Sequence, residues 1–332
     1  MKGDKILVLG SLAFDYIMGF EENFVNAVSI DINKKEFQST VTANSRTQNF
    51  GGTAGNIAYN LGLLNISPVS LLGSVGKDFE SLGYREHIAK FDNIELKVDI
   101  QNNLFTAACY IVNDIQSNQM IIFHGGALDE NKNIDLRKKI EHPEHYAYAI
   151  NSTQGIEAMM NFSEQLNELK IPTIFDPGQI TPLFSKDILL SILTKSEILI
   201  GNTHEINQVM SKIGMNEKDL LKYVSTIVKT KGSEGSELII KTTSGKFEYI
   251  EIPSSKPNKV IDTTGAGDGY RAGLLSGMIL KMDMQNSCRL GSIVGSFVVE
   301  TSGAQTQVYD IASVRERFLN TFGYIPSEIE NR

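Results

Sequence analysis

The segment from Asp262 to Tyr270 has residue types and spacing that could hold a phosphate group beside a carboxylate. It reads Asp-Thr-Thr-Gly-Ala-Gly-Asp-Gly-Tyr, so Gly265, Ala266 and Gly267 come directly before Asp268. Small residues at the start of a helix leave backbone N–H groups open to an anion. A neighbouring carboxylate can accept the proton of an attacking hydroxyl, so the segment predicts phosphoryl transfer to an alcohol. The apolar residues that follow have helical spacing: Leu274, Leu275, Met278, Ile279 and Met282.

Other nucleotide and metal motifs do not match. A P-loop ends in Gly-Lys-Ser/Thr, and neither Gly76-Lys77 nor Gly245-Lys246 is followed by Ser or Thr. A dinucleotide fingerprint needs a third glycine where Tyr270 stands. His204-Glu205 lacks the second histidine of a zinc protease motif, because that position is Gln208. For Gly265–Asp268 alone, an ordinary glycine-rich turn that caps a helix is the alternative interpretation.

Four segments, in the same order along the chain, resemble the signatures of the ribokinase-like carbohydrate kinases, the PfkB family. Asp262–Asp268 is similar to the specific D-T-T-G-A-G-D signature of that family. The other three are similar to its N-terminal Gly-Gly motif, its N-x-x-E motif and its T-K-G-x-x-G segment: Gly51–Asn56, Asn202–Glu205 and Thr230–Gly235. Within the family, Gly10–Asp15 and Ile122–Ala127 look most like the bacterial adenosine kinase-like branch.

The resemblance implies roles around a transferred phosphate and a sugar. It makes Asp268 the catalytic base and makes the amides of Gly265, Ala266 and Gly267 the donors that offset phosphate charge. It also implies that Asp15, just after the first predicted strand, binds two hydroxyls of the sugar, because a carboxylate can accept both hydrogen bonds. A helix-capping aspartate at 268 and a surface-loop aspartate at 15 are the alternatives.

Further substrate contacts are predicted for the Gly51–Asn56 motif and for Phe123. Gly51, Gly52 and Asn56 would meet the sugar from the start of a helix, where glycine permits close approach; a plain loop-to-helix turn is the alternative. Phe123 is a candidate to stack on a purine base. A phenylalanine of a sheet core is an equal alternative for Phe123.

The nucleotide and its metal ion are expected on the other side of the phosphate. By resemblance, Asn202 and Glu205 lie around Mg²⁺ and phosphate, with Mg²⁺ keeping several waters; an Asn cap with a helix-start glutamate is the alternative. Asn202 and Gly267 are also expected to bind ATP, together with the loop that contains Thr230, Lys231, Gly232 and Gly235. The alternative interpretation of Lys231 is a solvent-exposed charge without a role in nucleotide binding. Ser302–Ala304 are a weaker candidate to border the adenine. A K⁺ requirement is left open by these residues.

Three features depart from the family's pattern. Gly269 follows the predicted base where Ala, Ser or Thr is more usual, which predicts a looser helix start. Asp176-Pro177-Gly178-Gln179 lacks the Asn and Arg that many sugar kinases carry after this aspartate, which favours the nucleoside branch. Arg271 is expected either to touch phosphate or to face solvent.

Short apolar strands that alternate with helical patterns must position these residues. Alternation of this kind predicts a parallel sheet covered by helices on both faces, and the resemblance implies a ribokinase-like three-layer α/β/α fold with a central, mostly parallel sheet. Two strand-like regions, about 16–50 and 105–124, are expected to form a small β-sheet lid inserted in a single kinase domain, 1–332. Strands are predicted at 5–9, 69–72, 147–150, 173–176, 198–200, 226–230 and 237–241, and helices at 55–64, 156–169, 217–224 and 267–282.

Composition narrows the class of protein. The chain has 332 residues, of which 41% are hydrophobic, and a formal net charge of −8, so a large core is expected and a nucleic-acid partner is not. Cys109 and Cys288 form neither a disulfide framework nor a zinc spacing. No apolar run reaches the roughly 18 residues of a membrane span. We therefore expect a cytoplasmic protein, monomeric or homodimeric, with small-molecule partners and no membrane association.

Together these features predict an ATP-dependent kinase that phosphorylates a primary hydroxyl, foremost the 5′-hydroxyl of adenosine in purine salvage. A ribokinase or other sugar kinase shares every core motif and is the main alternative. A non-catalytic metabolite sensor on the same fold is disfavoured by the intact Asp268. A nicotinamide-dependent oxidoreductase is disfavoured by Tyr270 in the glycine fingerprint.

Overall fold

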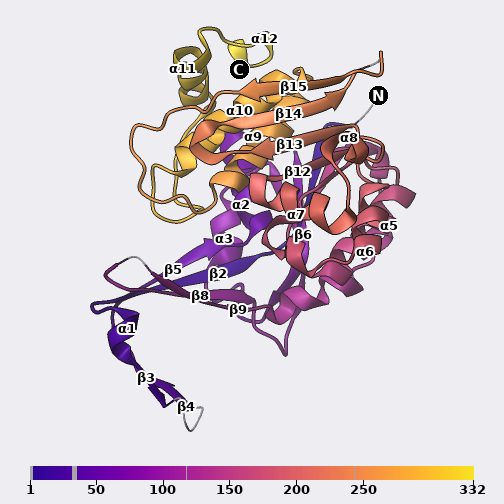
Figure 1. The fold of residues 1–332 in the computed structure, drawn as a ribbon. Coiled ribbons are helices and arrows are strands. Elements are labelled where there is room, and N and C mark those ends of the chain that lie inside the picture. The colour runs from indigo at the N-terminus through magenta and orange to yellow at the C-terminus, as the bar shows by residue number, and fades with distance from the viewer. Residues whose placement is uncertain (1–2, 32–35, 117, 243) are drawn as a thin grey trace.

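Nine strands form the central sheet of the structure, a computed structural model that describes residues 3–31, 36–116, 118–242 and 244–332. Their order across the sheet is β15-β14-β13-β12-β11-β10-β1-β6-β7 (Figure 1). Neighbours from β7 to β13 are parallel, whereas β14 and β15 add to the edge in antiparallel fashion. The strand bounds are β1 Lys5–Leu9, β6 Val69–Gly76, β7 Ile94–Gln101, β10 Tyr146–Asn151, β11 Thr173–Phe175, β12 Ile198–Asn202, β13 Thr226–Thr230, β14 Ser236–Lys241 and β15 Phe247–Ile252.

Helices cover both faces of this sheet (Figure 1). One face carries α2 Thr53–Leu64, α3 Tyr84–Ala89, α9 Ala266–Ile279 and α10 Met284–Val298, with α11 Ile311–Phe322 and α12 Ser327–Glu330 packed outside α10. The other face carries α4 Leu136–Lys139, α5 Ile156–Glu168, α6 Lys186–Leu193, α7 Thr203–Ile213 and α8 Glu217–Leu220. The 3₁₀ turns are η1 Gly126–Asn133, η2 Pro143–His145, η3 Gly178–Leu183 and η4 Gly232–Glu234.

Alternate residues of each strand face different helical layers, because successive side chains of a strand point to opposite sides. In β1, Ile6 and Val8 pack with residues of α2 and α9, whereas Leu7 and Leu9 pack with residues of α5. The sheet is therefore the middle one of three layers. The predicted α/β/α architecture with a mostly parallel sheet is confirmed.

Helices α9 and α10 approach each other closely because their facing residues are small. A Cβ atom on Gly273 would lie 2.5 Å from the carbonyl oxygen of Leu290, and one on Gly269 would lie 2.6 Å from Cγ2 of Val298. Gly269, which departs from the family's pattern, thus permits this packing. The expected loosening of the helix start is not seen, because α9 is continuous from Ala266.

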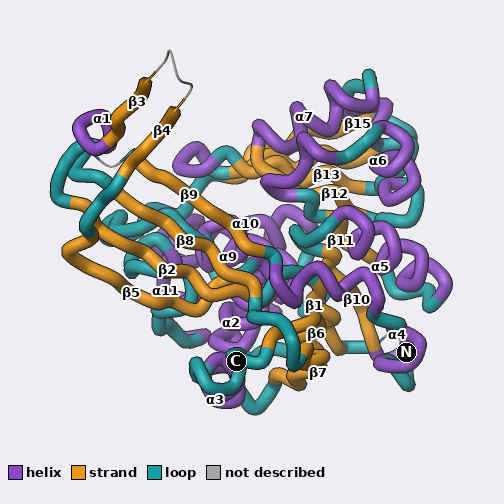
Figure 2. Tube along the Cα trace, turned by 90° about the horizontal axis from the view of Figure 1, so that it is seen from below, coloured by secondary structure: helices purple, strands orange, loops and turns teal. Residues whose placement is uncertain are grey.

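A second, four-stranded sheet extends from the central body (Figures 1 and 2). β2 Ala13–Phe20 pairs antiparallel with β5 Ala43–Gly51 and parallel with β8 Ala107–Asn113, and β9 Gln119–His124 forms the edge beside β8. The paired residues Ala13, Gly51 and Ala107, at the inner end of this sheet, are buried, whereas most residues further out along the strands are at least partly exposed, with Phe20 as a buried exception. A short helix, α1 Phe24–Ala27, and the hairpin of β3 Val28–Asp31 and β4 Glu36–Ser39 project further outward.

The strands of this second sheet lie mostly within the segments predicted to form a lid, 16–50 and 105–124. Residues 32–35 and 117 of those segments lie outside the described residues. Closure of the sheet over a substrate stays a prediction.

Several predicted element bounds agree with the structure, but two helices end several residues earlier than predicted. β1 and β13 have the predicted bounds. The helix predicted at 217–224 is wrong beyond Leu220, because the chain turns there and brings Leu221 and Val224 into the core. The helix predicted at 267–282 ends at Ile279, since Lys281 adopts a φ of 63° that no right-handed helix allows.

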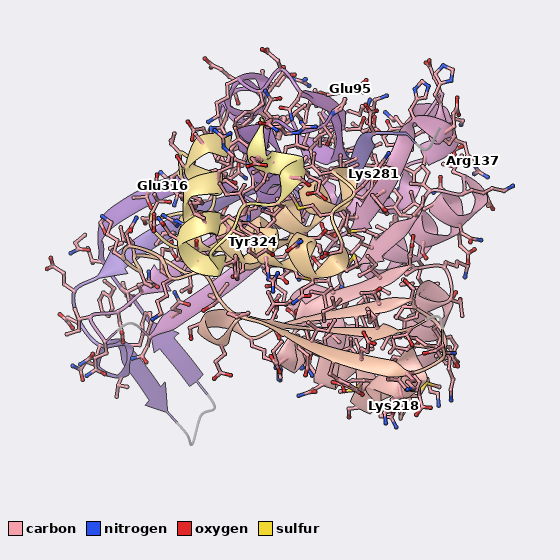
Figure 3. The ribbon with its side chains drawn as sticks, turned by 90° about the horizontal axis from the view of Figure 1, so that it is seen from above. Glu95, Arg137, Lys218, Lys281, Glu316 and Tyr324 are labelled. Atoms are coloured by element: carbon pink, nitrogen blue, oxygen red, sulfur yellow. The ribbon has the colours of Figure 1, made fainter. Side chains whose placement is uncertain are left out.

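Charged side chains of both signs are spread over the outer surface. Figure 3 shows Glu95, Arg137, Lys218, Lys281 and Glu316 on several sides of the molecule. Among the described residues, no helix is both long enough and apolar enough to cross a membrane. Both cysteines are free thiols.

Candidate active site

The first turn of α9 is a helix end without a side-chain cap. Gly265 is its N-cap residue, with a φ of 79° in the left-handed region that favours glycine. Within the described chain, no side chain caps this helix. The N–H of Ala266, predicted to face phosphate, donates instead to the carbonyl oxygen of Thr263 at 3.2 Å. The amides of Gly267 and Asp268 are therefore the first-turn donors left for an anion.

Asp268 lies beside this helix end and contacts a second predicted site residue. Nδ2 of Asn56, in α2, donates to Oδ2 of Asp268 at 2.8 Å, although the two residues are 212 positions apart in the chain. Burial raises the pKa of Asp268 to about 7, while Arg271 and the Asn56 bond oppose that rise. A carboxyl group whose pKa lies near neutral pH is well suited to act as a general base.

A buried ion pair supports the first turn of α9. Nε and Nη2 of Arg271 donate to the two carboxylate oxygens of Asp176, each at 2.5 Å, and Nη1 donates to the carbonyl oxygen of Gly267 at 2.9 Å. Both charged side chains are buried. The expectation that Arg271 faces solvent is wrong, because its side chain is buried and holds the Gly267 peptide through the carbonyl oxygen. A contact of Arg271 with phosphate stays a prediction.

Asp262 connects the first turn of α9 to the loop between α10 and α11. Its Oδ1 accepts from the N–H of Thr264 and its Oδ2 accepts from the N–H of Gly303, both at 2.9 Å. Ala304 then packs against Gly265, where a Cβ atom on the glycine would lie 2.6 Å from that of Ala304. This loop, the weaker candidate to border the adenine, thus lies against the anion site; its contact with adenine stays a prediction.

Asp15 lies in β2, close enough to the anion site for the two to interact electrostatically. Burial, followed by the charge of Asp262, raises the pKa of Asp15 to about 6. Gly51 leaves room for this carboxylate, because a Cβ there would lie 2.2 Å from Oδ2 of Asp15. Gly52 has a φ of 86°, and a Cβ would lie 2.5 Å from the carbonyl oxygen of Ser11. Both glycines thus have a backbone role, and their contacts with a sugar stay predictions.

Phe123 lies in the same row of the second sheet as Asp15. The row consists of Asn49, Asp15, Cys109 and Phe123, which are direct neighbours on β5, β2, β8 and β9. Directly paired residues point to one face of a sheet. That face is turned towards the anion site, because a Cβ on Gly303 would lie 3.3 Å from Cγ of Asn49. Phe123 is 54% exposed, so the structure does not place it in a sheet core.

Asn202 and Glu205, the residues predicted around Mg²⁺, form a reciprocal cap at the start of α7. Oδ1 of Asn202 accepts from the N–H of Glu205 at 2.9 Å, and Oε2 of Glu205 accepts from the N–H of Asn202 at 2.7 Å. The alternative interpretation as a helix cap is therefore present in the structure. Burial and then the charge of Asp176 raise the pKa of Glu205, which places this carboxyl near the ion pair behind Gly267.

A hollow of about 620 Å³ lies beside the loop that follows β13. Its lining includes Asn202, Thr230, Lys231 and Gly232. Nζ of Lys231 donates to both carboxylate oxygens of Glu251, at 2.7 and 3.0 Å, so its charge is balanced within the sheet edge. Gly235 has a φ of 97°, and a Cβ would lie 2.0 Å from the carbonyl oxygen of Ile252. The contacts of this loop with ATP stay predictions.

A hollow of about 660 Å³ lies between α11 and the loop after β15 and contains none of the predicted site residues. Its aromatic wall is Phe297. The Arg317 guanidinium lies 3.5 Å from the centre of that ring, and Tyr309 stacks on it at 4.7 Å between ring centres. The Phe297 ring is therefore already engaged by its neighbours and is a poor platform for a planar base.

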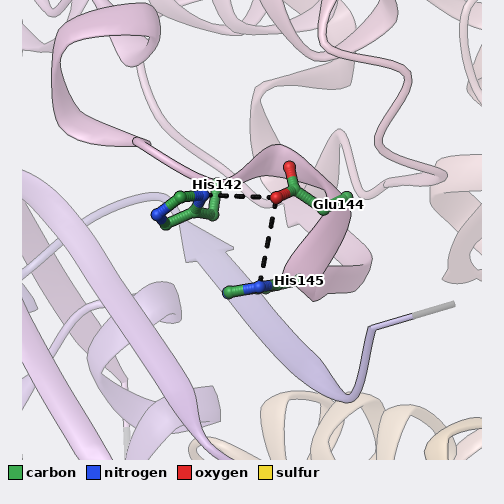
Figure 4. Close-up of side chains that lie close together, drawn as sticks. All are labelled: His142, Glu144 and His145. Carbon is green, nitrogen blue, oxygen red and sulfur yellow. Dashed lines mark hydrogen bonds and ion pairs between the residues drawn. The ribbon is translucent and has the colours of Figure 1, made fainter. Parts of the chain in front are cut away.

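A histidine cluster lies away from the site. Of the residues described, His142, Glu144 and His145 are the one group of three whose potential ligand atoms lie within 4.8 Å of one another (Figure 4). Oε1 of Glu144 lies 3.2 Å from Nδ1 of His142 and 4.0 Å from Nε2 of His145. The cluster is exposed and directly precedes β10, at the amino edge of the parallel strands. Asp176 and Asn202 lie at the carboxyl ends of β11 and β12, so this cluster is separate from the anion site.

The sequence-based prediction missed residues that position the site. Asp262 and Arg271 belong to or adjoin the signature segment, and their acid and base character could have suggested ion pairs or loop contacts. Asp176 follows a predicted strand, which is where ligand or support residues gather in α/β folds. Gln305, which donates to Oδ1 of Asn56 at 2.9 Å, carried no signal in the sequence pattern.

Comparison with known proteins gives a family match over most of the chain. A family model described as pfkB family carbohydrate kinase matches residues 5–311. The nucleoside kinase of Methanocaldococcus jannaschii is 32% identical over 316 residues, which cover 95% of this chain and 97% of that protein. Its crystal structure, described as an archaeal member of the ribokinase family, superposes with a TM-score of 0.83 at 30% identity and covers 96% of this chain and 99% of the other.

Two further relatives bear on the substrate. The structure of a Burkholderia thailandensis nucleoside kinase in complex with inosine has a TM-score of 0.80 at 28% identity, covering 97% of this chain and 99% of the other. The ribokinase of Lactococcus lactis is 25% identical over 273 residues, covering 80% of this chain and 85% of that protein.

Proposed function

The chain belongs to the pfkB family of carbohydrate kinases, and on that premise we propose that it transfers the γ-phosphoryl group of ATP to the 5′-hydroxyl of a nucleoside, foremost adenosine. One observation carries this proposal. The carboxyl group of Asp268, whose pKa is raised to about 7, lies at the start of α9. The backbone amides of Gly267 and Asp268 in the same turn have no side-chain cap. A proton acceptor and an anion site therefore meet at one helix end.

Different residues of the site accept the proton, stabilise the phosphate charge and position the helix end. Oδ2 of Asp268 accepts the Asn56 bond, so Oδ1 is the oxygen that receives the proton of the 5′-hydroxyl. The hydroxyl oxygen forms the new P–O bond, the bond between the γ-phosphorus and the bridging oxygen breaks, and ADP leaves with that electron pair. The amides of Gly267 and Asp268 offset negative charge on the transferred group. Arg271 keeps the Gly267 peptide in place through its carbonyl oxygen.

The carboxylate of Glu205 fits the Mg²⁺ ion that the family implies. Oε2 is occupied by the Asn202 amide, and no donor in the described part of the chain bonds Oε1. Mg²⁺ is usually held by one or two carboxylates together with substrate phosphates and water, so Glu205, with Asn202 beside it, would hold the ion. When bound, the ion offsets negative charge on the phosphates.

The row of the second sheet that contains Asp15 and Phe123 supports a nucleoside rather than a free sugar as substrate. An ionised Asp15 can accept hydrogen bonds from two ribose hydroxyls. Phe123 lies on the same face. Three of the four residues in the next row on that face are apolar, namely Ile17, Ile111 and Ile121, and the fourth is Thr47. A free pentose offers no planar group to this surface, whereas a purine base can stack on Phe123. Closure of the second sheet over the nucleoside would exclude water from the transferred phosphate.

A panel of acceptors tests the proposal. Purified protein with ATP and Mg²⁺ is assayed with adenosine, inosine, cytidine, ribose and fructose, and adenosine should give the highest kcat/KM. Asp268→Asn should lower kcat by at least about 100-fold, the lower end of what a general base contributes, while ATP binding measured by calorimetry is retained. Faster turnover of ribose than of any nucleoside would favour the sugar kinase alternative, and full activity of Asp268→Asn would exclude the assigned base.

Phe123→Ala separates the two acceptor classes within one experiment. Loss of the stacking surface should raise KM for adenosine about tenfold, which lies within the roughly 1–3 kcal/mol of base stacking, and leave KM for ribose unchanged. Ile122→Ala serves as the matched control, because Ile122 is also exposed on β9 but points to the opposite face. Equal effects of the two variants would contradict the stacking role.

A further inference from the structure

We propose that Gln305 is a positioning residue for Asp268: it orients the amide of Asn56 so that Asn56 donates to one carboxylate oxygen and leaves the other open to the substrate hydroxyl. The inference rests on the proposed function, in which Asp268 is the base. It concerns a residue in the loop between α10 and α11 whose hydrogen bonds, among the described residues, do not include one to Asp268.

Gln305 is the centre of a buried chain of hydrogen bonds. It is 2% exposed. Its Nε2 donates to Oδ1 of Asn56 at 2.9 Å and to Oη of Tyr84 at 2.8 Å, and it has a longer contact of 3.5 Å with the carbonyl oxygen of Gly51. Tyr84, which is fully buried, donates from Oη to the carbonyl oxygen of Gly51 at 2.7 Å. Asn56 completes the chain by donating to Oδ2 of Asp268 at 2.8 Å.

The direction of every bond in this chain follows from the backbone of Gly51. A carbonyl oxygen can only accept, so the single hydroxyl hydrogen of Tyr84 is committed to Gly51. Tyr84 must then accept from Gln305, which turns the NH₂ group of Gln305 towards Tyr84 and Asn56. Asn56 consequently presents its carbonyl oxygen to Gln305 and its NH₂ group to Asp268.

Two further observations show that the structure is built around this contact. A Cβ atom on Gly55 would lie 1.9 Å from Oη of Tyr84 and 3.0 Å from Nε2 of Gln305, so this glycine of the Gly51–Asn56 motif makes the room that the chain needs. Oε1 of Gln305 is buried without a hydrogen-bond partner among the described residues. An unpaired buried oxygen is unfavourable. The Gln305 side chain also interacts with His87, whose pKa is lowered by burial and raised by this interaction.

The orientation of Asn56 matters for the charge of Asp268. The Asn56 bond lowers the pKa of Asp268 and thus opposes the effect of burial. An Asn56 amide that rotates would direct its oxygen at the carboxylate, which disfavours the ionised form. Without Gln305, a smaller fraction of Asp268 would therefore be ionised and able to accept a proton near neutral pH.

Gln307 offers a matched control. It is 1% exposed, and its Nε2 donates to Oδ1 of Asn60 at 3.0 Å. Asn60 lies one helical turn after Asn56 in α2 and has no bond to Asp268. Gln307 thus has the same residue type, burial and kind of partner as Gln305, but lies outside the chain that ends at Asp268. Substitution of either residue should reduce stability; only substitution of Gln305 should alter the base.

The kinetic test measures kcat for adenosine from pH 5.5 to 9 in the parent, Gln305→Met, Gln305→Glu and Gln307→Met. Neither Met nor an ionised Glu can donate to Asn56. In both Gln305 variants the acid limb of kcat should move upward by about half to one pH unit, which is about a three- to tenfold loss at pH 6, with KM for ATP unchanged. Gln307→Met should keep the parent limb. An unmoved limb in the Gln305 variants, or an equal shift in Gln307→Met, would overturn the proposal.

A second measurement does not depend on turnover. The pKa of Asp268 is obtained from the difference in urea stability between each protein and its Asp268→Asn counterpart across pH. Because the pKa of Asp268 is raised in the fold, its contribution to stability is fully present below about pH 4 and is lost as pH rises through the folded pKa. In Gln305→Met this loss should extend to higher pH than in the parent; an identical curve would refute the positioning role.

These two measurements distinguish a failure of the proposed function from a failure of the positioning role of Gln305. A parent protein that phosphorylates no nucleoside would reject the proposed function, and the titration would still decide the effect of Gln305 on Asp268. If Gln305→Met does not fold, Tyr84→Phe replaces it in both measurements, because it removes the acceptor that fixes the Gln305 amide and keeps the aromatic packing. A shift in the same direction supports the proposal, and no shift overturns it.

Discussion

At the level of single residues, the site contains two carboxyl groups that burial affects in the same direction. The pKa of Asp15 is raised to about 6 and that of Asp268 to about 7, in each case chiefly by burial. In the proposed reaction both must be ionised, since Asp15 accepts hydrogen bonds from ribose and Asp268 accepts a proton. Protonation of either group therefore removes activity, but through different steps.

We predict two acid steps in the pH profile of kcat/KM for adenosine, which reports the free enzyme. The value should fall about tenfold per pH unit below pH 7 and about a hundredfold per unit below pH 6, as the second group is protonated. Asp15→Asn should lower the plateau and leave only the step near pH 7. Retention of both steps in Asp15→Asn would show that another group causes the lower one.

The buried pair of Arg271 and Asp176 gives a prediction about stability. Arg271→Met leaves Asp176 charged and without its partner in the core, so it should lower the free energy of unfolding by about 3–5 kcal/mol, measured by urea denaturation. Arg85→Met is the control, because Arg85 forms a surface pair with Glu80 at 2.8 Å and should cost less than about 1 kcal/mol. Similar losses in the two variants would contradict a special role of the buried pair.

At the level of elements, α9 has to hold Asp268 in place while it packs along α10. Gly269 and Gly273 lie on the side of α9 that faces α10, and either would collide with α10 if it carried a Cβ atom. The helix that carries the proposed base is therefore fixed by close backbone contact over its first two turns. Movement of α9 relative to α10 would displace both the amides and the carboxylate of the site.

We predict that Gly273→Ala destabilises the protein, although alanine is the better helix former by about 1 kcal/mol. The added methyl group would lie 2.5 Å from the Leu290 carbonyl oxygen, and overpacking of this kind costs about 1–3 kcal/mol. Gly155→Ala is the matched control, because nothing lies within 4 Å of its Cβ position and its φ is −57°. Thermal denaturation should show a clear loss only for Gly273→Ala; equal melting temperatures would argue against a tight contact between the helices.

The elements also show what could be predicted from sequence. Lys5–Leu9 and Thr226–Thr230 are short apolar runs with polar or glycine neighbours, and both are strands as predicted. Ile94–Gln101 is a strand that the sequence analysis does not predict, although its alternating apolar residues fit the period of a strand. Phe247–Ile252 is also not predicted, and its adjacent Tyr249 and Ile250 interrupt that alternation. The predicted helix 217–224 is too long, because helical spacing cannot show that packing in the core ends a helix at Leu220.

The site residues likewise show that local motifs can be predicted from the sequence, whereas contacts between distant segments cannot. The types of Asp268 and Asn56 were enough to propose chemistry, because their motifs are local. Their contact could not be predicted, since it depends on how α2 and α9 pack across 212 positions of chain. The ion pair of Lys231 with Glu251 likewise depends on the pairing of β14 with β15, and a single sequence carries no record of such long-range geometry.

At the level of the whole molecule, two sheets meet at the proposed site. The central sheet and α9 carry the anion site, whereas Asp15 belongs to the second sheet, most of whose residues beyond the inner ends of β2, β5 and β8 are at least partly exposed. A nucleoside bound between Asp15 and Asp268 would connect the two parts. ATP alone would contact only the larger one.

We therefore predict that hydrogen exchange will distinguish the two ligands. Adenosine should slow exchange of backbone amides in β2, β5, β8 and β9, because binding to Asp15 holds the outer sheet against the body, whereas a non-hydrolysable ATP analogue alone should slow exchange only around α9 and the loop after β13. In Asp15→Asn, protection of the second sheet by adenosine should be lost while protection by the analogue persists. Protection of the second sheet by the analogue alone, or its persistence in Asp15→Asn, would mean that this sheet does not act as a lid held through the nucleoside.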